Sequence, residues 1–389
     1  MWIPRDIQKE LQELSSSYPV VTITGPRQSG KTTLAKMQFP NYNYCNLEHP
    51  EIRAFAKKDP NAFFNRFKCP LIIDEIQRVP ELLSFIQVKV DEQNEKGLFI
   101  LTGSHQFGIG QAVSQTLAGR TALLTLLPLS IKELSQSGFS KSRDEYLFHG
   151  FLPRIYKNQL NPLKAYRNYF QTYIERDVRQ LTKVKDLLKF ETFLRLLAGR
   201  IGQVLNLNSL SNDAGVSSTT LKEWLSILEA SFIILRIPPY YENFGKRFIK
   251  SPKFYFTEPG LVSYLLGIEA ENQISRDPLI GSLFENMVVI EAVKSRLNKG
   301  LDHNLFFFRD NHGNEVDLLF KKRHKLIPIE IKAAMTFHDT FYKGIKFFQR
   351  LTELADKGYI IFAGDLTFEN NSISVINFRD TSIIFSDTD

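Results

Sequence analysis

The sequence predicts an α/β protein that opens with a parallel sheet flanked by helices and continues into further domains. Three observations predict this fold class. The first third alternates short apolar runs with amphipathic stretches, which is typical of a parallel sheet between helices. From about residue 190 the pattern changes to short helices and two strand-like runs, and from about residue 277 an apolar helix precedes further strands. At 389 residues, the chain also exceeds what one hydrophobic core usually holds.

Four segments follow from this pattern. Residues 1–140 should form the first α/β domain, 141–189 a helical connector packed on it, 190–276 a module of short helices and a hairpin, and 277–389 a small second α/β domain. The strands of the first domain are expected at residues 19–24, 42–46, 70–74, 98–102 and 122–127. Those of the last domain are expected at residues 304–308, 315–320, 325–332 and 359–363.

The composition is that of a folded chain. Hydrophobic residues at 43% and charged residues at 23% are close to globular averages. A net charge of +7 permits a nucleic-acid partner without requiring one. Cys45 and Cys69 stand in apolar surroundings rather than in a cysteine–histidine cluster, so neither a disulfide framework nor a zinc site is expected. No run is apolar enough for a signal peptide or a membrane span, so we expect a cytoplasmic protein without membrane association.

A glycine-rich loop between a predicted strand and a predicted helix is the strongest chemical signal. It has the pattern Gly-x-x-x-x-Gly-Lys-Thr of a phosphate-binding loop, or P-loop. The glycines let backbone N–H groups face phosphates, Lys31 can reach the β- and γ-phosphates of ATP, and the Thr32 hydroxyl can ligate Mg²⁺. A phosphate-free glycine turn is the weaker alternative in this context. The expected contacts to ATP are Gly25, Pro26, Arg27, Gln28, Ser29, Gly30, Lys31, Thr32 and Thr33.

Two acids end the third expected strand. Asp74 can hold the magnesium shell and Glu75 can polarise the attacking water, so we expect ATP hydrolysis with Glu75 and Lys31 as catalytic groups. Without the P-loop, solvated acids at a strand end would be the ordinary interpretation. The fourth expected strand also ends in polar residues. Thr102 or Ser104 could therefore contact the γ-phosphate, and we assign Ser104 to the nucleotide site, although an ordinary strand end explains these residues nearly as well.

An added cation usually stabilises the charge that develops during γ-phosphoryl transfer. Arg120 and Arg154 are the candidates, and we assign Arg120 to the catalytic set. A structural ion pair is the alternative interpretation for each arginine. Either could also act within one subunit or between the subunits of a homo-oligomer.

The third segment is predicted to be a winged helix. The pattern is a helix, a glycine turn, a second helix with a capped start and a hairpin, at residues 208–217, 218–229, 231–236 and 253–256. The second helix would read DNA, and the wing would contact phosphates. Against this, Glu223 and Glu229 make that helix less basic, and winged helices also serve as packing elements, so DNA contact is one of two interpretations. The basic residues of the wing are Lys246, Arg247, Lys250 and Lys253.

Several later segments, together with the P-loop and its two acids, resemble one family. They are residues 130–134, 173–179, 224–230, 243–247, 251–256 and 284–285. The family resembled is a large prokaryotic family of AAA-type ATPases that end in a domain of unknown function with a restriction-endonuclease-like fold. The resemblance covers nearly the whole chain and implies an AAA-type core, a winged helix and a restriction-endonuclease-like C-terminal domain. In one departure, Glu258 stands where the family usually has an aspartate.

Acidic residues lie on consecutive expected strands of the last domain. Because side chains alternate along a strand, Glu330 and Lys332 share a face, and Asp317 on the neighbouring strand can join them. This is the Asp…Glu-x-Lys arrangement of metal-dependent nucleases. Asp317 and Glu330 would hold Mg²⁺, Glu285 would complete the shell and Lys332 would orient water. An ion pair of Glu330 with Lys332 or Arg309 is the structural alternative.

Three functional hypotheses follow. The first is an ATP-driven machine or switch that acts on DNA, with ATP and Mg²⁺ as cofactors. The second is an ATP-dependent switch that binds a protein partner, in which the winged helix and an inactive nuclease-like domain serve as scaffolds. The third is a metal-dependent DNA nuclease whose ATPase gates access. Stimulation of ATP turnover by DNA would separate the first hypothesis from the second.

Overall fold

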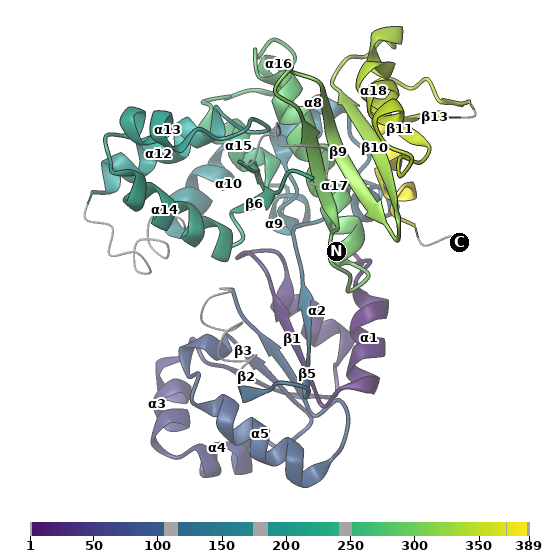
Figure 1. The fold of residues 1–389 in the computed structure, drawn as a ribbon. Helices are drawn as coiled ribbons and strands as arrows, with labels where there is room; N and C mark the ends of the chain where they lie inside the picture. Colours follow the sequence, from purple (N-terminus) through teal and green to yellow (C-terminus); the bar gives the residue numbers. More distant parts are fainter. Residues whose placement is uncertain (1, 105–115, 174–185, 241–250, 371, 387–389) are drawn as a thin grey trace.

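The computed structural model describes residues 2–104, 116–173, 186–240, 251–370 and 372–386. These residues form two lobes (Figure 1). The N-terminal sheet and its helices make the lower lobe in this view, and the chain that follows makes the upper lobe. The first residues of the chain lie at the junction of the two lobes. Within the described ranges, no helix is both long and apolar enough to cross a membrane.

The lower lobe is built on a five-stranded parallel sheet with the order β2-β3-β4-β1-β5. All of β1, β3 and β4 is buried, because helices cover both faces of the sheet. One face packs against α1 and α2, the other against α3, α4 and α5. The strands are β1 (Val20–Thr24), β2 (Asn43–Asn46), β3 (Leu71–Asp74), β4 (Phe99–Thr102) and β5 (Thr121–Thr125). The helices are α1 (Gln8–Ser17), α2 (Lys31–Gln38), α3 (Pro50–Lys58), α4 (Pro60–Arg66) and α5 (Leu82–Gln93), with a 3-10 turn η1 (Ile76–Arg78).

This lobe confirms the predicted parallel sheet with flanking helices. Its strands begin and end within two residues of their expected positions. Because the strands are parallel, the segments that follow β1, β3 and β4 emerge from one edge of the sheet. Open parallel sheets bind ligands at this carboxyl edge.

The upper lobe has one continuous core. Buried apolar side chains of the connector, the helical module and the last sheet form a single cluster that runs from Leu127 to Phe385 and includes Ile3. The long helix α17 (Ile280–Leu297) contacts elements on both sides of the expected boundary after residue 276. The expected domains of this half therefore do not pack as separate units. We call residues 127–386 the downstream body.

The helical part of the downstream body places α13 and α14 around a glycine turn. Gly215 has φ 63° at the end of α13, and the Ser217 hydroxyl caps α14 by accepting from Thr220 N. The antiparallel pair β6–β7 follows, and Lys253 in β7 is buried. Three residues of the predicted wing lie outside the described residues: Lys246, Arg247 and Lys250. The elements are α7 (Ile131–Gln136), α8 (Arg143–His149), α9 (Pro153–Lys157), α10 (Pro162–Tyr169), α12 (Leu187–Ala198), α13 (Leu207–Ala214), α14 (Ser218–Ala230), β6 (Ile234–Ile237), β7 (Lys253–Phe256), α15 (Pro259–Leu265) and α16 (Glu271–Ile274).

The last part of the downstream body is a six-stranded mixed sheet with the order β12-β13-β11-β10-β9-β8. Its central strands are largely buried, because α17 packs on one face and α18 on the other. The predicted second α/β unit is thus present. The elements are β8 (Leu305–Arg309), β9 (Glu315–Lys322), β10 (Lys325–Lys332), α18 (Lys343–Leu351), β11 (Gly358–Phe362), β12 (Phe368–Glu369) and β13 (Ile373–Asn377), with 3-10 turns η3 (Asp339–Tyr342) and η4 (Phe378–Ile383).

Candidate nucleotide-binding site

The P-loop connects β1 to α2 at the carboxyl edge of the first sheet. Gly25 and Gly30 both have positive φ values, 143° and 98°. A Cβ at Gly25 would collide with the backbone oxygen of Leu126, so this position requires glycine. Gly30 is the N-cap residue of α2, and the free N–H groups of the first helical turn therefore face the loop. This arrangement suits a phosphate.

Lys31 is buried inside the loop. Its Nζ donates to the carbonyl oxygens of Gly25, at 2.9 Å, and Pro26, at 2.7 Å. Burial lowers the pKa of the Lys31 amine to about 8, although the carboxylates of Glu75 and Asp74 act in the opposite direction. A bound phosphate would replace these carbonyl contacts with a stronger, charge-assisted interaction.

Asp74 is the centre of a hydroxyl network. Its carboxylate accepts from Thr32 Oγ1 at 2.9 and 3.1 Å, from Tyr44 Oη at 2.9 Å and from Thr102 Oγ1. Asp74 is buried, so these donors replace the water that it loses. Our sequence analysis missed Tyr44, because it lies in β2 and meets Asp74 only through the pairing of β2 with β3. Thr102, expected near the γ-phosphate, supports Asp74 instead.

Glu75 follows Asp74 in a left-handed conformation with φ 58°. Its carboxylate accepts from Gln77 Nε2 and from Ser104 Oγ, the latter at 3.3 Å. Burial raises the pKa of Glu75 above its ordinary value, against the opposing effect of Lys31 and Arg27. Ser104 therefore orients Glu75 in this structure, whereas the sequence suggested a contact to phosphate.

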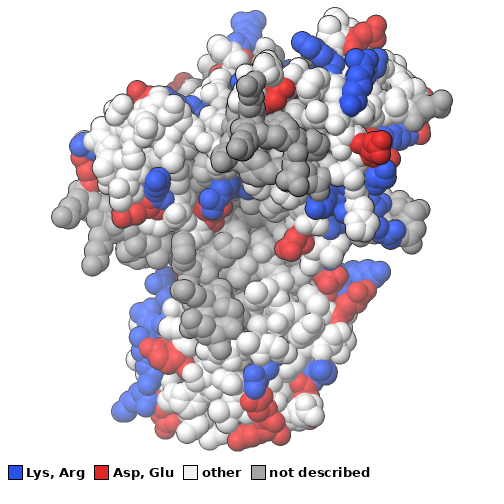
Figure 2. Space-filling view, viewed as in Figure 1, with Lys and Arg blue, Asp and Glu red and all other residues white. Residues whose placement is uncertain are grey.

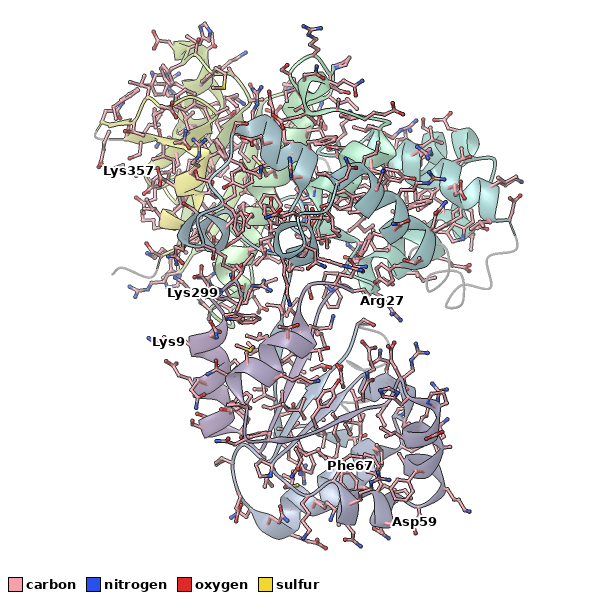
Figure 3. The ribbon with its side chains drawn as sticks, turned by 180° about the vertical axis from the view of Figure 1, so that it is seen from behind. Lys9, Arg27, Asp59, Phe67, Lys299 and Lys357 are labelled. Atoms are coloured by element: carbon pink, nitrogen blue, oxygen red, sulfur yellow. The ribbon has the colours of Figure 1, made fainter. Side chains whose placement is uncertain are left out.

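A cavity of about 710 Å³ opens over the P-loop, and residues of both lobes line it. The lower lobe contributes expected site residues: Arg27, Gln28, Gly30, Lys31, Thr32, Thr33, Asp74 and Glu75. The downstream body contributes Leu129 and residues of two short segments, 153–158 and 172–173: Pro153, Arg154, Lys157, Asn158, Thr172 and Tyr173. Arg27 lies at the junction of the lobes (Figure 3), where its guanidinium is 5.7 Å from the centre of the Tyr173 ring. The cavity thus belongs to both lobes.

Arg120 lies outside this site. It precedes β5 at the amino edge of the sheet, where its carbonyl accepts from Val20 N, and it pairs with Asp91 at 2.6 Å. The length of β1, roughly 16 Å at 3.3 Å per residue, separates that edge from the P-loop. Arg120 therefore cannot reach the nucleotide site of its own chain, and its assignment to the catalytic set is corrected for a site formed by a single chain. Arg154, the second candidate, lines the cavity.

A buried polar network joins the P-loop to the downstream body. Arg5 donates to the carbonyl of Ser29, at 2.7 Å, and pairs with Glu133 of α7 at 3.1 Å. The first turn of α7 continues the network, because Ile131 N donates to Glu291 of α17 at 2.8 Å. The sequence offered no signal for this network, since its members are more than 20 residues apart.

Two predicted metal ligands of the last domain, Asp317 and Glu330, form ion pairs with Lys332. Asp317 accepts from Lys332 Nζ at 2.9 Å and from Ile331 N at 2.8 Å, and Glu330 pairs with the same lysine. Burial and the neighbouring Asp317 raise the pKa of Glu330 well above its ordinary value. The three residues do share one place in the fold, as predicted, but as an ion-pair cluster.

Glu285 is paired with a lysine of β7. Its carboxylate accepts from Lys253 Nζ at 3.0 Å and from Tyr255 Oη at 2.6 Å. Lys253 also pairs with Glu315 at 2.7 Å. This lysine was expected in the wing, but it neutralises the charge of two carboxylates, Glu285 and Glu315. Over the described part of the chain, no group of three His, Cys, Asp or Glu side chains could hold a metal ion. In this structure the predicted ligands Glu285, Asp317 and Glu330 are each paired with a lysine.

The chain is similar to known domains and proteins along most of its length. An AAA domain matches residues 17–135, and two domains of unknown function match residues 140–272 (DUF8612) and 280–380 (DUF4143). An uncharacterized protein of Mycobacterium tuberculosis is 30% identical over 336 residues, which are 85% of this chain and 74% of the relative. One of Haemophilus influenzae is 26% identical over 352 residues, 80% of this chain and 82% of the relative. A Walker-type ATPase of Pyrococcus abyssi shares 14% identity at a TM-score of 0.46, over 67% of this chain and 94% of that structure.

Proposed function

We propose that this chain, which belongs to the same family as its mycobacterial relative, is a magnesium-dependent ATPase. It carries the AAA domain of P-loop ATPases, and it would couple ATP hydrolysis to nucleic-acid binding. One observation carries the proposal. The cavity over the P-loop is lined by both lobes, so a nucleotide bound there contacts the AAA domain and the downstream body at once. Binding and hydrolysis would change the relation between them.

The residues at the cavity suit Mg²⁺ bound with ATP. Thr32 Oγ1 and the Asp74 carboxylate are hydrogen-bonded to each other and both residues line the cavity. Magnesium prefers hydroxyl, carboxylate and water oxygens together with substrate phosphates. Thr32 and Asp74 would hold the ion, which neutralises phosphate charge when it is bound. Tyr44 and Thr102 keep the Asp74 carboxylate in place.

Glu75 has the position and the environment of a general base. It lines the cavity beside Asp74, and Ser104 and Gln77 fix its orientation. Because burial raises its pKa, the Glu75 carboxylate binds a proton more readily than an exposed glutamate does. It would orient the attacking water and accept its proton. Lys31 would hold the β- and γ-phosphates.

The nucleic-acid half of the proposal rests on the downstream body. The order α13, glycine turn, α14 and β6–β7 fits a winged helix, a module that binds DNA in many proteins. The alternative, a switch that binds a protein partner, uses the same ATP site. Lys253 and Lys332 pair with the carboxylates of the predicted metal set, so a metal ion would have to displace these contacts, and the proposed function is restricted to ATP hydrolysis and nucleic-acid binding.

The first prediction concerns ATP turnover. Lys31→Ala should weaken ATP binding, whereas Glu75→Gln should retain binding and slow hydrolysis by about three orders of magnitude, because the amide cannot accept the proton. Binding would be measured by calorimetry and turnover by phosphate release, each with and without single- and double-stranded DNA. Turnover of Glu75→Gln at the wild-type rate would remove Glu75 from the mechanism. A rate of ATP turnover that is the same with and without either form of DNA would favour the switch that binds a protein partner.

A further inference from the structure

Positive charge is concentrated in one short stretch of the last domain. Residues 321–350 contain eight Lys or Arg and two acidic residues, Glu330 and Asp339, whereas the whole chain has 49 basic and 42 acidic residues. Glu330 is buried, so only Asp339 adds negative charge to the surface formed by this stretch. Figure 2 shows Lys and Arg side chains over this C-terminal part of the upper lobe.

The helix α18 presents three of these cations on one face. Ile345 and Phe348 are buried against the sheet, whereas Lys343, Lys346 and Arg350, spaced three and four residues apart, are exposed. None of the three forms an ion pair with a residue that the structure describes. The outer face of α18 is therefore basic and available to a ligand.

The turn between β9 and β10 extends this face. Lys325 Nζ donates to the carbonyl of Glu353, just beyond the end of α18, at 3.2 Å. Lys321, near the end of β9, and Arg323, in the turn, are also exposed. We call the resulting set the α18 basic surface: Lys321, Arg323, Lys325, Lys343, Lys346 and Arg350.

An aromatic group lies at the start of α18. The ring of Phe337 is 5.6 Å from Phe341, 5.5 Å from Tyr342 and 5.3 Å from Phe368, centre to centre. Phe368 is 36% exposed, and the exposed ring of His338 lies 5.7 Å from Phe341. Such rings can stack on unpaired nucleobases, and base–aromatic stacking tolerates any sequence.

We propose that the α18 basic surface and the Phe368 ring bind single-stranded nucleic acid. Phosphates would follow the cations of α18 and the β9–β10 turn, and one base would stack on Phe368. A duplex fits less well, because its bases are already stacked on each other. An anionic membrane also fits less well, since the apolar face of α18 is buried against its own sheet and has nothing to insert. The inference rests on the nucleic-acid half of the proposed function.

The second prediction tests this surface in the full chain. Lys343→Gln, Lys346→Gln and Arg350→Gln together should weaken binding of a labelled oligothymidylate by about tenfold or more at moderate salt. They should also flatten the salt dependence by about two units of slope, because each lost phosphate contact removes about 0.7 units. Phe368→Ala should weaken binding by about tenfold and Phe368→Tyr should restore it. Fluorescence anisotropy over a salt series measures both.

The matched control removes three exposed cations from the other lobe. It combines Lys57→Gln, Lys58→Gln and Lys68→Gln. These lysines are close in sequence to Asp59 and Phe67, which Figure 3 shows at the far end of the lower lobe. This variant should bind the oligonucleotide like the wild type. ATP turnover without nucleic acid should be unchanged in all variants, since none of these residues lines the nucleotide cavity.

Three outcomes would overturn the inference. Wild-type affinity and slope in the α18 variant would mean that another surface binds nucleic acid, and the proposed function would stand. Failure of the wild type to bind any oligonucleotide would remove both the surface and the nucleic-acid half of the proposed function, while ATP turnover would still test the other half. Binding only to vesicles of phosphatidylserine in phosphatidylcholine would replace the nucleic acid by a membrane.

Discussion

At the scale of single residues, Lys31 is poised to respond to nucleotide by taking up a proton. Burial lowers the pKa of its amine to about 8, so the free protein at pH 8 holds this lysine partly neutral. Phosphates placed beside Nζ favour the charged form and raise the pKa. Above pH 8 the free protein therefore lacks charge that the bound state requires, and its affinity for ATP should fall as the pH rises.

The third prediction follows from this shift. Binding of a non-hydrolysable ATP analogue at pH 8 should take up a fraction of a proton, and the uptake should be smaller at pH 7, where Lys31 is already mostly charged. Calorimetry in two buffers of different ionisation enthalpy measures the uptake. Lys31→Arg is the control, because arginine stays charged throughout. Equal heats in both buffers at pH 8 would mean that Lys31 is charged before ATP binds.

The sequence predicted those site residues that are neighbours in the chain. The P-loop, Asp74 and Glu75 were readable because their spacing and their position after a strand carry the signal. Tyr44 and Arg5 were not readable, since each reaches the site through the tertiary fold. Nor did the sequence separate Arg120 from Arg154, because Arg154 reaches the cavity only through the packing of the downstream body against the AAA domain.

At the scale of secondary-structure elements, Glu258 links three segments of the downstream body. Its Oε1 accepts from Phe151 N and Tyr166 Oη, both at 2.8 Å, and from Gly260 N in the first turn of α15. Burial raises the pKa of Glu258 to about 7, although Lys294 and these donors act in the opposite direction. The family's usual aspartate would be one methylene shorter, which places its carboxylate farther from these donors.

The fourth prediction concerns stability against pH. The folded-state pKa of Glu258 is raised from 4.5 to about 7, so its contribution to stability is complete below pH 4.5 and is lost as the pH rises through about 7. The loss amounts to roughly 3 kcal/mol. Glu258→Gln should lack this part of the pH dependence, whereas the exposed Glu269→Gln should retain it. Urea unfolding at a series of pH values measures both. An unchanged pH dependence in Glu258→Gln would mean that Glu258 is ionised across this range.

Elements were easier to predict than their contacts. Apolar runs predicted the five strands of the first sheet and β8 to β11 of the last sheet nearly as the structure has them, because burial on one or both faces leaves a clear pattern, whereas β12 and β13 were not predicted. The lysine that pairs with Glu285 could not be predicted from any strand pattern. Lys253 comes from β7, far from the last sheet in sequence, and its amine lies between Glu285 and Glu315.

At the scale of the whole molecule, the nucleotide cavity lies where two cores meet. The sheet of the AAA domain has its own core on each face, and the downstream body has one continuous core. The cavity and the network of Arg5, Glu133 and Glu291 connect them. We therefore expect nucleotide binding to act on the downstream body as a unit, because a single close-packed core transmits displacement.

The fifth prediction compares the two arginines that the sequence could not distinguish. Arg154 reaches the cavity from α9 of the downstream body, so it can meet the γ-phosphate only when the two lobes are held together. Arg154→Ala should lower kcat by about a thousandfold, as loss of an arginine that stabilises transition-state charge does, with a smaller effect on ATP affinity. Arg120→Ala is the matched control and should leave kcat unchanged, because that arginine pairs with Asp91 at the opposite edge of the sheet. Phosphate release at saturating ATP measures both. A large loss in Arg120→Ala that depends on protein concentration would contradict the single-chain site and indicate that one subunit supplies Arg120 to the nucleotide of another.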